Sequence, residues 1–270
     1  MNIYDVNRHS KVIKQIINLN RRTYRDKKGL FFVEGERILE EAINSDYKIK
    51  YLICSQSYVK KKNHKLIDRL ICKGLNIYVI DDKLMEEISD TVTPQGIIAV
   101  VEKKIIHVES VLNSSANHFL LIVDGVRDPG NLGTIIRTAH ACGVNGVFLI
   151  KGTVDQFNPK VLRSAAGSIF HVPVLMLDDT EQIIIDLKKA GINVIISHLQ
   201  GDKYPFNVDL KEPIAIVVGN EAFGVNPKLA DICNNLVKIP MPGNAESLNV
   251  AVAAGILMYE VVRQRLIGIL

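Results

Sequence analysis

The sequence has 270 residues, of which 47% are apolar, and a formal net charge of +4. That length suggests about two domains, since a domain commonly has roughly 150 residues. No apolar run reaches 18 residues, and residues 1–11 lack the apolar core of a signal peptide, so we expect a soluble, cytoplasmic protein. The mild positive charge permits a nucleic-acid partner without requiring one.

The four cysteines stand singly in apolar or helical settings, and no two of them form a C-x-x-C pair: Cys54, Cys72, Cys142 and Cys233. We expect them to be reduced, buried and inert. The sequence predicts no metal site.

The first hundred residues alternate between strand and helix patterns. Strands are predicted at residues 31–34, 49–54, 75–80 and 97–101, and helices at residues 36–44, 58–72 and 82–88. This order predicts a compact α/β/α domain over residues 1–103. Residues 104–117 lose this pattern and become rich in Ser and Asn, so we predict a linker there.

A run of cations follows an amphipathic start in residues 10–30. Five cations fall within eight positions: Arg21, Arg22, Arg25, Lys27 and Lys28. A solvated helix end, where cations favour the helix dipole, is the commoner origin of such a run. Contact with nucleic-acid phosphates is the functional alternative.

The second half begins with an apolar strand at residues 119–123, followed by a loop with Pro129 and Gly130 and by a helix. The glycines do not form G-x-G-x-x-G, and G-x-x-x-x-G-K-[ST] is absent, which argues against a Rossmann dinucleotide site and a P-loop. Asn131 and Arg137 lie on this helix, about 9 Å apart along its axis at ~1.5 Å per residue. One site could contain both.

Two later strand ends carry polar residues. Gly219 and Gly224 bracket Asn220 and Glu221 directly after the strand at residues 214–218, which suggests close backbone approach to a ligand. A short strand at residues 237–239 leads through two prolines into a helix predicted to begin at Ser247 and to be buried almost all round. Ser247 could simply cap that helix. Strand ends of α/β sheets are nevertheless where ligands bind.

Three stretches resemble the signatures of the SpoU (TrmH-like) family of RNA 2′-O-methyltransferases. They are DGVRDPGNLGTIIRT at residues 124–138, GNEAFG at 219–224 and IPMPGNAESLNVAVA at 239–253, in the family's order. The pieces FFVEGERILEEAI and TPQGIIAVV are similar to the substrate-binding domain of many SpoU enzymes, whose fold resembles small ribosomal RNA-binding proteins.

The resemblance implies an α/β fold with a C-terminal SPOUT domain, residues 118–270, whose parallel sheet contains a trefoil knot. The preceding α/β/α domain would bind RNA, and the enzyme would be a homodimer. The implied reaction is S-adenosylmethionine-dependent methylation of a ribose 2′-OH in structured RNA, with ribosomal RNA favoured over tRNA.

The resemblance also assigns residues. Catalytic positions fall on Arg137, Asn131, Glu221, Ser247 and Asn249. Cofactor contacts fall on Ser197, Leu199, Gly219, Asn220, Ile239, Met241, Ser247, Leu248 and Ala253. Besides the N-terminal cations, Lys160 and Arg163 would contact RNA. Arg137 could be a base, an orienting group or a phosphate clamp, because a guanidinium with a pKa above ~12 is a poor base.

Three alternatives remain at this point. One is a tRNA 2′-O-methyltransferase, and another is an RNA-binding or resistance protein that kept the fold but lost catalysis. The intact polar set argues against the second of these. A nucleotide-dependent oxidoreductase on a doubly wound sheet is the third.

Overall fold

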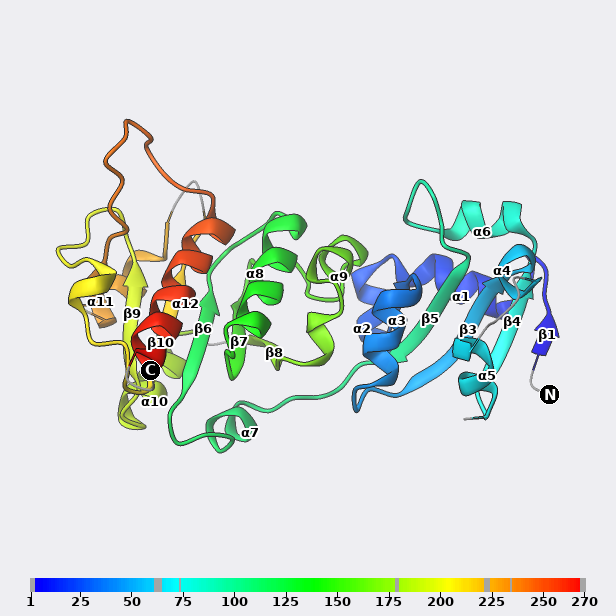
Figure 1. The fold of residues 1–270 in the computed structure, drawn as a ribbon, viewed down its shortest axis with the longest axis horizontal. Coiled ribbons are helices and arrows are strands. Elements are labelled where there is room, and N and C mark those ends of the chain that lie inside the picture. Colours follow the sequence, from blue (N-terminus) through cyan, green and yellow to red (C-terminus); the bar gives the residue numbers. More distant parts are fainter. Residues whose placement is uncertain are drawn as a thin grey trace. The chain divides into compact units, whose positions relative to one another are not determined.

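The chain folds into two compact units in the computed structural model, which describes residues 3–60, 65–72, 74–177, 180–220, 224–233 and 235–267 (Figure 1). Unit 1 comprises Met1–Ile105 and Phe157–Phe170, and unit 2 comprises Ile106–Gln156 and His171–Leu270. The chain therefore passes from one unit to the other three times.

Unit 1 is built on a five-stranded sheet whose strand order is β1-β4-β3-β5-β2. The strands are β1 (Ile3–Asp5), β2 (Leu30–Glu34), β3 (Ile49–Ser55), β4 (Asn76–Ile80) and β5 (Ile97–Glu102). Strands β1, β4 and β3 are parallel, whereas β5 runs antiparallel to both β3 and β2. The four predicted strands are present. Strand β1 is not predicted from the sequence, because it has three residues and no fully buried side chain.

Six helices accompany this sheet in the described part of Met1–Ile105. They are α1 (Lys11–Leu19), α2 (Arg22–Lys28), α3 (Glu36–Ile43), α4 (Gln56–Lys60), α5 (Lys65–Cys72) and α6 (Asp82–Ile88). Helix α1 buries one apolar stripe, because Ile13, Ile16 and Leu19 recur at helical spacing and pack into the core with Phe32 and Ile98 of the sheet.

A segment from the second half of the sequence completes unit 1. It contains α9 (Pro159–Ala165) and the short helix η1 (Ser168–Phe170). The rings of Phe157 and Phe170 lie 4.6 and 6.2 Å from the ring of Phe31, centroid to centroid. A Cβ atom at Gly167 would lie 2.4 Å from Cγ of Glu41, so the segment approaches α3 as closely as a glycine allows.

Unit 2 contains a six-stranded sheet in the order β11-β9-β10-β6-β7-β8, and all its pairings are parallel. The strands are β6 (Phe119–Val123), β7 (Gly146–Ile150), β8 (Val174–Leu177), β9 (Asn193–Ser197), β10 (Ile214–Val218) and β11 (Leu236–Val237). Apolar runs such as β6 and β10 are buried throughout, as expected for strands covered on both faces.

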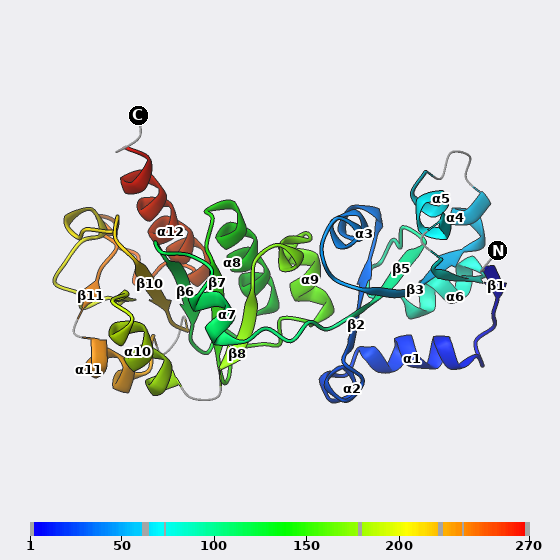
Figure 2. The same cartoon turned by 90° about the horizontal axis from the view of Figure 1, so that it is seen from below.

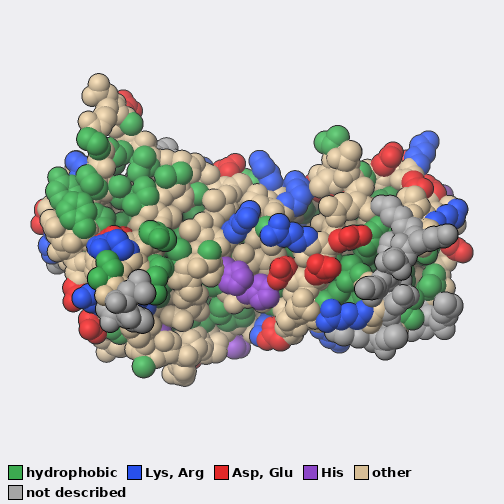
Figure 3. Space-filling view, viewed as in Figure 1, with side chains coloured by type: hydrophobic (Ala, Val, Ile, Leu, Met, Phe, Trp, Pro, Cys, Tyr) green, Lys and Arg blue, Asp and Glu red, His purple; other side chains and the backbone are tan. Residues whose placement is uncertain are grey.

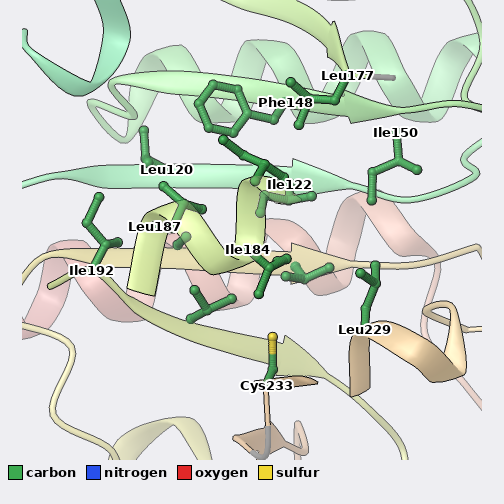
Figure 4. Packing of buried hydrophobic residues seen from close by; sticks show 14 of the residues in the cluster. Leu120, Ile122, Phe148, Ile150, Leu177, Ile184, Leu187, Ile192, Leu229 and Cys233 are labelled. Carbon is green, nitrogen blue, oxygen red and sulfur yellow. The ribbon is translucent and has the colours of Figure 1, made fainter. Parts of the chain in front are cut away.

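Helices cover both faces of this sheet (Figures 1 and 2). Helices α8 (Pro129–Ala141) and α12 (Val250–Leu266) pack together on one face, and α10 (Thr180–Lys189) and α11 (Pro227–Cys233) pack together on the other. Figure 4 shows part of the core between sheet and helices, which includes Leu120, Ile122, Phe148, Ile184, Leu187 and Leu229. Helix α7 (Val108–Leu112) lies inside the predicted linker and adds Val111 to this core.

Two expectations about α12 are wrong. The helix begins at Val250, because the side chain of Asn249 accepts hydrogen bonds from the N–H groups of Ala251 (2.9 Å) and Val252 (3.3 Å) and so provides the N-cap in place of Ser247. The helix is also not buried all round. Val252, Ile256 and Tyr259 are 51%, 41% and 66% exposed.

None of the described helices is long and apolar enough to cross a bilayer.

Candidate functional site

A cavity of about 380 Å³ opens in unit 2 at the carboxyl ends of β9, β10 and β11. Its lining also includes the loop before α12 and the first turn of that helix. It is formed by Ser197, His198, Leu199, Gln200, Val218, Gly219, Asn220, Gly224, Ile239, Met241, Ser247, Leu248, Val250 and Ala253. All nine residues predicted to contact a cofactor are in this lining. The carboxyl edge of a parallel sheet is the usual ligand site of α/β proteins.

Gly219 forms part of one wall. The sequence suggests a glycine there so that the backbone can approach a ligand, but the structure gives a different reason. A Cβ atom there would lie 2.3 Å from the carbonyl carbon of Gly224 and 2.4 Å from the nitrogen of Val225. Asn220 and Gly224 exchange backbone hydrogen bonds of 3.0 and 2.8 Å, which close a tight loop. Glycine is therefore required by the backbone of the protein itself, before any ligand binds. Glu221, predicted to be catalytic, lies outside the described residues.

The opposite wall joins the chain after β9 to the chain after β11. The N–H of His198 donates to the carbonyl of Val237 (3.0 Å), and the N–H of Lys238 donates to the carbonyl of Lys203 (2.8 Å). Between them, a Cβ atom at Gly201 would lie 2.8 Å from the nitrogen of Lys238. Gly201 is not among the predicted site residues, and its position shortly after a strand is the one sequence feature that could have indicated it.

Asn131 and Asn249 meet, although neither lines the cavity. The side-chain nitrogen of Asn249 donates to the side-chain oxygen of Asn131 over 3.0 Å and joins the N-terminal ends of α12 and α8. Asp128 caps α8 by accepting from the N–H of Asn131 (2.8 Å), so Asn131 itself is not the N-cap. The side chain of Asn131 therefore orients Asn249 beside Leu248 and Val250 of the cavity.

Arg137 does not join this group within one chain. Its side chain is exposed on α8, it is absent from the cavity lining, and it has no ion-pair or hydrogen-bond partner within the described ranges. Neither Asn131 nor Arg137 lines the cavity, and that one site contains both residues stays a prediction.

The five predicted RNA-binding cations of residues 21–28 differ in how exposed they are. Arg21, Arg22, Lys27 and Lys28 are exposed. Arg25 is only 2% exposed, and its Nη1 donates to the carbonyl oxygens of Leu19 (2.8 Å) and Asn20 (2.9 Å). The prediction for Arg25 is wrong, because this guanidinium satisfies the carbonyls at the end of α1 and cannot reach RNA.

The two predicted RNA-binding cations on α9 also differ in their surroundings. Lys160 is exposed, whereas Arg163 forms an ion pair with Asp90 inside unit 1. Arg163 is about one-third exposed, so an RNA phosphate would compete with a carboxylate for it.

The cysteines give no sign of reactivity. Burial raises the pKa of the Cys54 thiol to about 12, and burial also raises the pKa of Cys142 and Cys233. These three are free thiols, although Cys142 is half-buried and not buried as predicted. The side chain of Cys72 lies outside what the structure describes. In the described part of the chain, no three His, Cys, Asp or Glu side chains gather as a metal-binding group.

A ligand cavity at the edge of a parallel sheet, formed by three irregular loops and a capped helix, defines an α/β protein with a small-molecule site. A sequence model of the SpoU rRNA Methylase family matches residues 118–259, and a model of the MRM3-like substrate binding domain matches residues 10–99. The chain belongs to the SpoU rRNA Methylase family.

Relatives of known name are similar over nearly the whole chain. The 23S rRNA (guanosine(2553)-2′-O)-methyltransferase RlmP of Bacillus subtilis is 37% identical over 247 residues, which cover 92% of this chain and 94% of the relative. The 23S rRNA (uridine(2479)-2′-O)-methyltransferase of Streptomyces viridochromogenes is 30% identical and covers 93% and 88%.

Solved structures agree with these relatives. The AdoMet-bound rRNA methyltransferase from Sinorhizobium meliloti superposes with a TM-score of 0.86 at 30% identity, covering 97% of this chain and 98% of that one. The SpoU methyltransferase AviRb from Streptomyces viridochromogenes, in complex with AdoMet, gives a TM-score of 0.85 at 27% identity and covers 96% and 99%.

Proposed function

We propose that this protein transfers the methyl group of S-adenosylmethionine to a ribose 2′-OH of ribosomal RNA. The cavity at the ends of β9, β10 and β11 carries the proposal, because its lining contains every residue that the family resemblance assigns to the cofactor. Two relatives similar along more than 90% of the chain are named 23S rRNA 2′-O-methyltransferases, and they support ribosomal RNA over tRNA as substrate.

The cavity suits this cofactor in size and chemistry. About 380 Å³ lies within the range of small-molecule sites, roughly 300–1,000 Å³. Ile239, Met241 and Leu248 offer apolar walls for an adenine ring, and the backbone after Ser197 and Val218 offers hydrogen-bonding groups for its polar edge. When bound, the cofactor supplies a methyl group on a positively charged sulfur atom. The protein's task is to align that group with the ribose hydroxyl.

The polar residues around the cavity would orient the ribose hydroxyl toward the methyl group. Asn131, Ser247 and Asn249 would position the ribose or the cofactor, with Glu221 as the acid of the second signature. Arg137 would stabilise or orient the hydroxyl and a neighbouring phosphate, since a planar guanidinium grips a phosphate in two places. Because Arg137 is absent from the cavity lining, a bound RNA or a partner subunit would complete the site.

A homodimer belongs to the same proposal. Exposed apolar residues of α12 and of the short helix η2 (Pro205–Asn207) surround a hollow of about 660 Å³ on unit 2, where Figure 3 shows hydrophobic side chains gathered. They include Phe206, Val252, Ile256 and Tyr259, and Phe206 is 57% exposed. A contiguous apolar face of this kind is typical of an association surface. Glu260 at its rim would face the partner.

The trefoil knot and the cytoplasmic location stay part of the proposal. The strand order supports the knot. Strand β11 is the edge strand beside β9, whereas the helix that follows it, α12, packs against β10 and α8 in the middle of the unit. RNA modification is consistent with a cytoplasmic enzyme.

A direct assay tests the function. The full chain is incubated with methyl-labelled S-adenosylmethionine and, separately, with 23S rRNA, 16S rRNA and bulk tRNA, and the labelled nucleotide is mapped. We expect label on a ribose 2′-oxygen of 23S rRNA. Label on tRNA alone would identify the tRNA alternative, and cofactor binding without transfer to any RNA would indicate a catalytically silent relative.

A further inference from the structure

Two residues directly after β6, Asp124 and Gly125, hydrogen-bond to the chain after β10 at Asn220, which lines the cavity, and at Asn226. The side-chain nitrogen of Asn220 donates to the carbonyl oxygen of Gly125 (2.9 Å), and the N–H of Asn226 donates to Oδ2 of Asp124 (2.8 Å). The Asp124–Gly125 corner thus fixes where this wall of the cavity stands.

The corner is itself held by Thr153, which follows β7. Oγ1 of Thr153 accepts from the N–H of Gly125 (3.0 Å) and donates to the carbonyl of Val123 (3.1 Å). Thr153 is only 3% exposed, so water is a poor substitute for its hydroxyl. Gly125 has φ +68°, a left-handed conformation that favours glycine.

We propose that Thr153 and Asp124 are positioning residues for the cofactor. Neither lines the cavity. The chain of contacts runs from the Thr153 hydroxyl through Gly125 to the Asn220 side chain, and Asp124 holds Asn226, which lies two residues after Gly224 of the cavity lining. This inference rests on the proposed function, because it takes the cavity to be the S-adenosylmethionine site.

Replacing Thr153 with valine keeps the shape of the side chain and removes the hydroxyl. The N–H of Gly125 and the carbonyl of Val123 then lose a partner at a buried position. Because an unsatisfied buried group is unfavourable, the corner shifts and the Asn220 wall moves with it. We expect Thr153→Val to weaken S-adenosylmethionine binding by about fivefold or more. Thr153→Ser keeps both hydrogen bonds and should bind nearly as the parent does.

Calorimetry of the full-length variants with S-adenosylmethionine measures this effect. Thr138→Val is the matched control, because the hydroxyl of Thr138 bonds only to the carbonyl of Thr134 within α8 (2.9 Å) among the bonds described. Steady-state kinetics adds a second readout. The KM for S-adenosylmethionine should rise in Thr153→Val, whereas the KM for RNA and the rate at saturating cofactor should stay close to those of the parent.

Asp124 provides a test that does not depend on folding of the valine variant. The N–H of Asn226 is at an exposed position, so water can replace the carboxylate in Asp124→Ala and the fold should persist. Asp124→Ala should weaken cofactor binding at least about threefold. Asp124→Asn, which keeps an oxygen acceptor, should restore most of the affinity.

The possible outcomes separate this inference from the proposed function. If the parent protein does not bind S-adenosylmethionine, the proposed function is wrong. If the parent binds it and Asp124→Ala and a folded Thr153→Val bind equally well, the positioning role is wrong. A Thr153→Ser variant as weak as Thr153→Val would also overturn it, because the effect would then not depend on the hydroxyl.

Discussion

Arg25→Ala should destabilise unit 1 without acting through RNA. The guanidinium donates two hydrogen bonds to carbonyls at the end of α1, and its side chain is almost completely buried. Removing it leaves the carbonyls of Leu19 and Asn20 without this donor and opens a cavity. A hydrogen bond to a charged group contributes about 1.5–3 kcal/mol, so losing two corresponds to about 3–6 kcal/mol. That is a large part of the stability of a typical domain, about 5–15 kcal/mol.

Thermal unfolding of the full chain, followed by circular dichroism, measures this loss. A change of this size should lower the midpoint of unit 1 by about 10 °C or more. Arg22→Ala is the matched control, because Arg22 is exposed and its ion pair with Asp26 is 3.6 Å long. Arg25→Lys should fall between them, since lysine keeps the charge but lacks the planar fork. An Arg25→Ala variant that melts with the parent would refute this account of the buried guanidinium.

Four more measurements bear on the site and on unit 1. Neutralising the four exposed cations of residues 21–28 together should flatten the salt dependence of RNA binding. The slope of log binding constant against log salt concentration should fall by at most about 0.9 per lost phosphate contact, and an unchanged slope would mean that these cations do not contact RNA. Gly219→Ala should abolish cofactor binding by displacing the backbone at Gly224, whereas Gly243→Ala, which has open space around it, should not. A chain starting at residue 117 should be poorly soluble and bind a hydrophobic dye, because the ring of Phe157 would lose its contact with the ring of Phe31 and become exposed. Arg137→Ala should slow single-turnover methylation at least ~100-fold with little change in cofactor affinity, and near-parental rates would remove it from the mechanism.

The strands and the cofactor wall could be predicted from sequence because their signals are local. Apolar runs such as β6 and β10 end close to Gly125 and Gly219, and parallel strands bring their carboxyl ends together. Resemblance to the family then indicated which residues near these strand ends would contact the cofactor. The reason for Gly219 could not be foreseen, because it depends on the backbone of Gly224 after the loop has closed.

The remaining differences come from tertiary contacts. A run of five cations gives no indication that Arg25 turns inward, since its acceptors are carbonyls that become available only where α1 ends. The partner of Phe157 is more than a hundred residues earlier, so nothing local assigns the segment to unit 1. At the start of α12, Ser247 and Asn249 are both good N-caps, and only the geometry selects Asn249.

The segment Phe157–Phe170 also affects the order of folding during synthesis. Unit 1 stands first in the sequence, yet its aromatic core around Phe31 lacks Phe157 and Phe170 until residue 170 has been made. From residue 105 to residue 170 the ribosome adds 65 residues, which takes roughly 3–13 s at about 5–20 residues per second. During that interval the nascent unit 1 exposes an apolar surface, and the residues of strands β6 and β7 of unit 2 are synthesised before it ends. The unit that starts first is therefore not complete before unit 2 has begun to form.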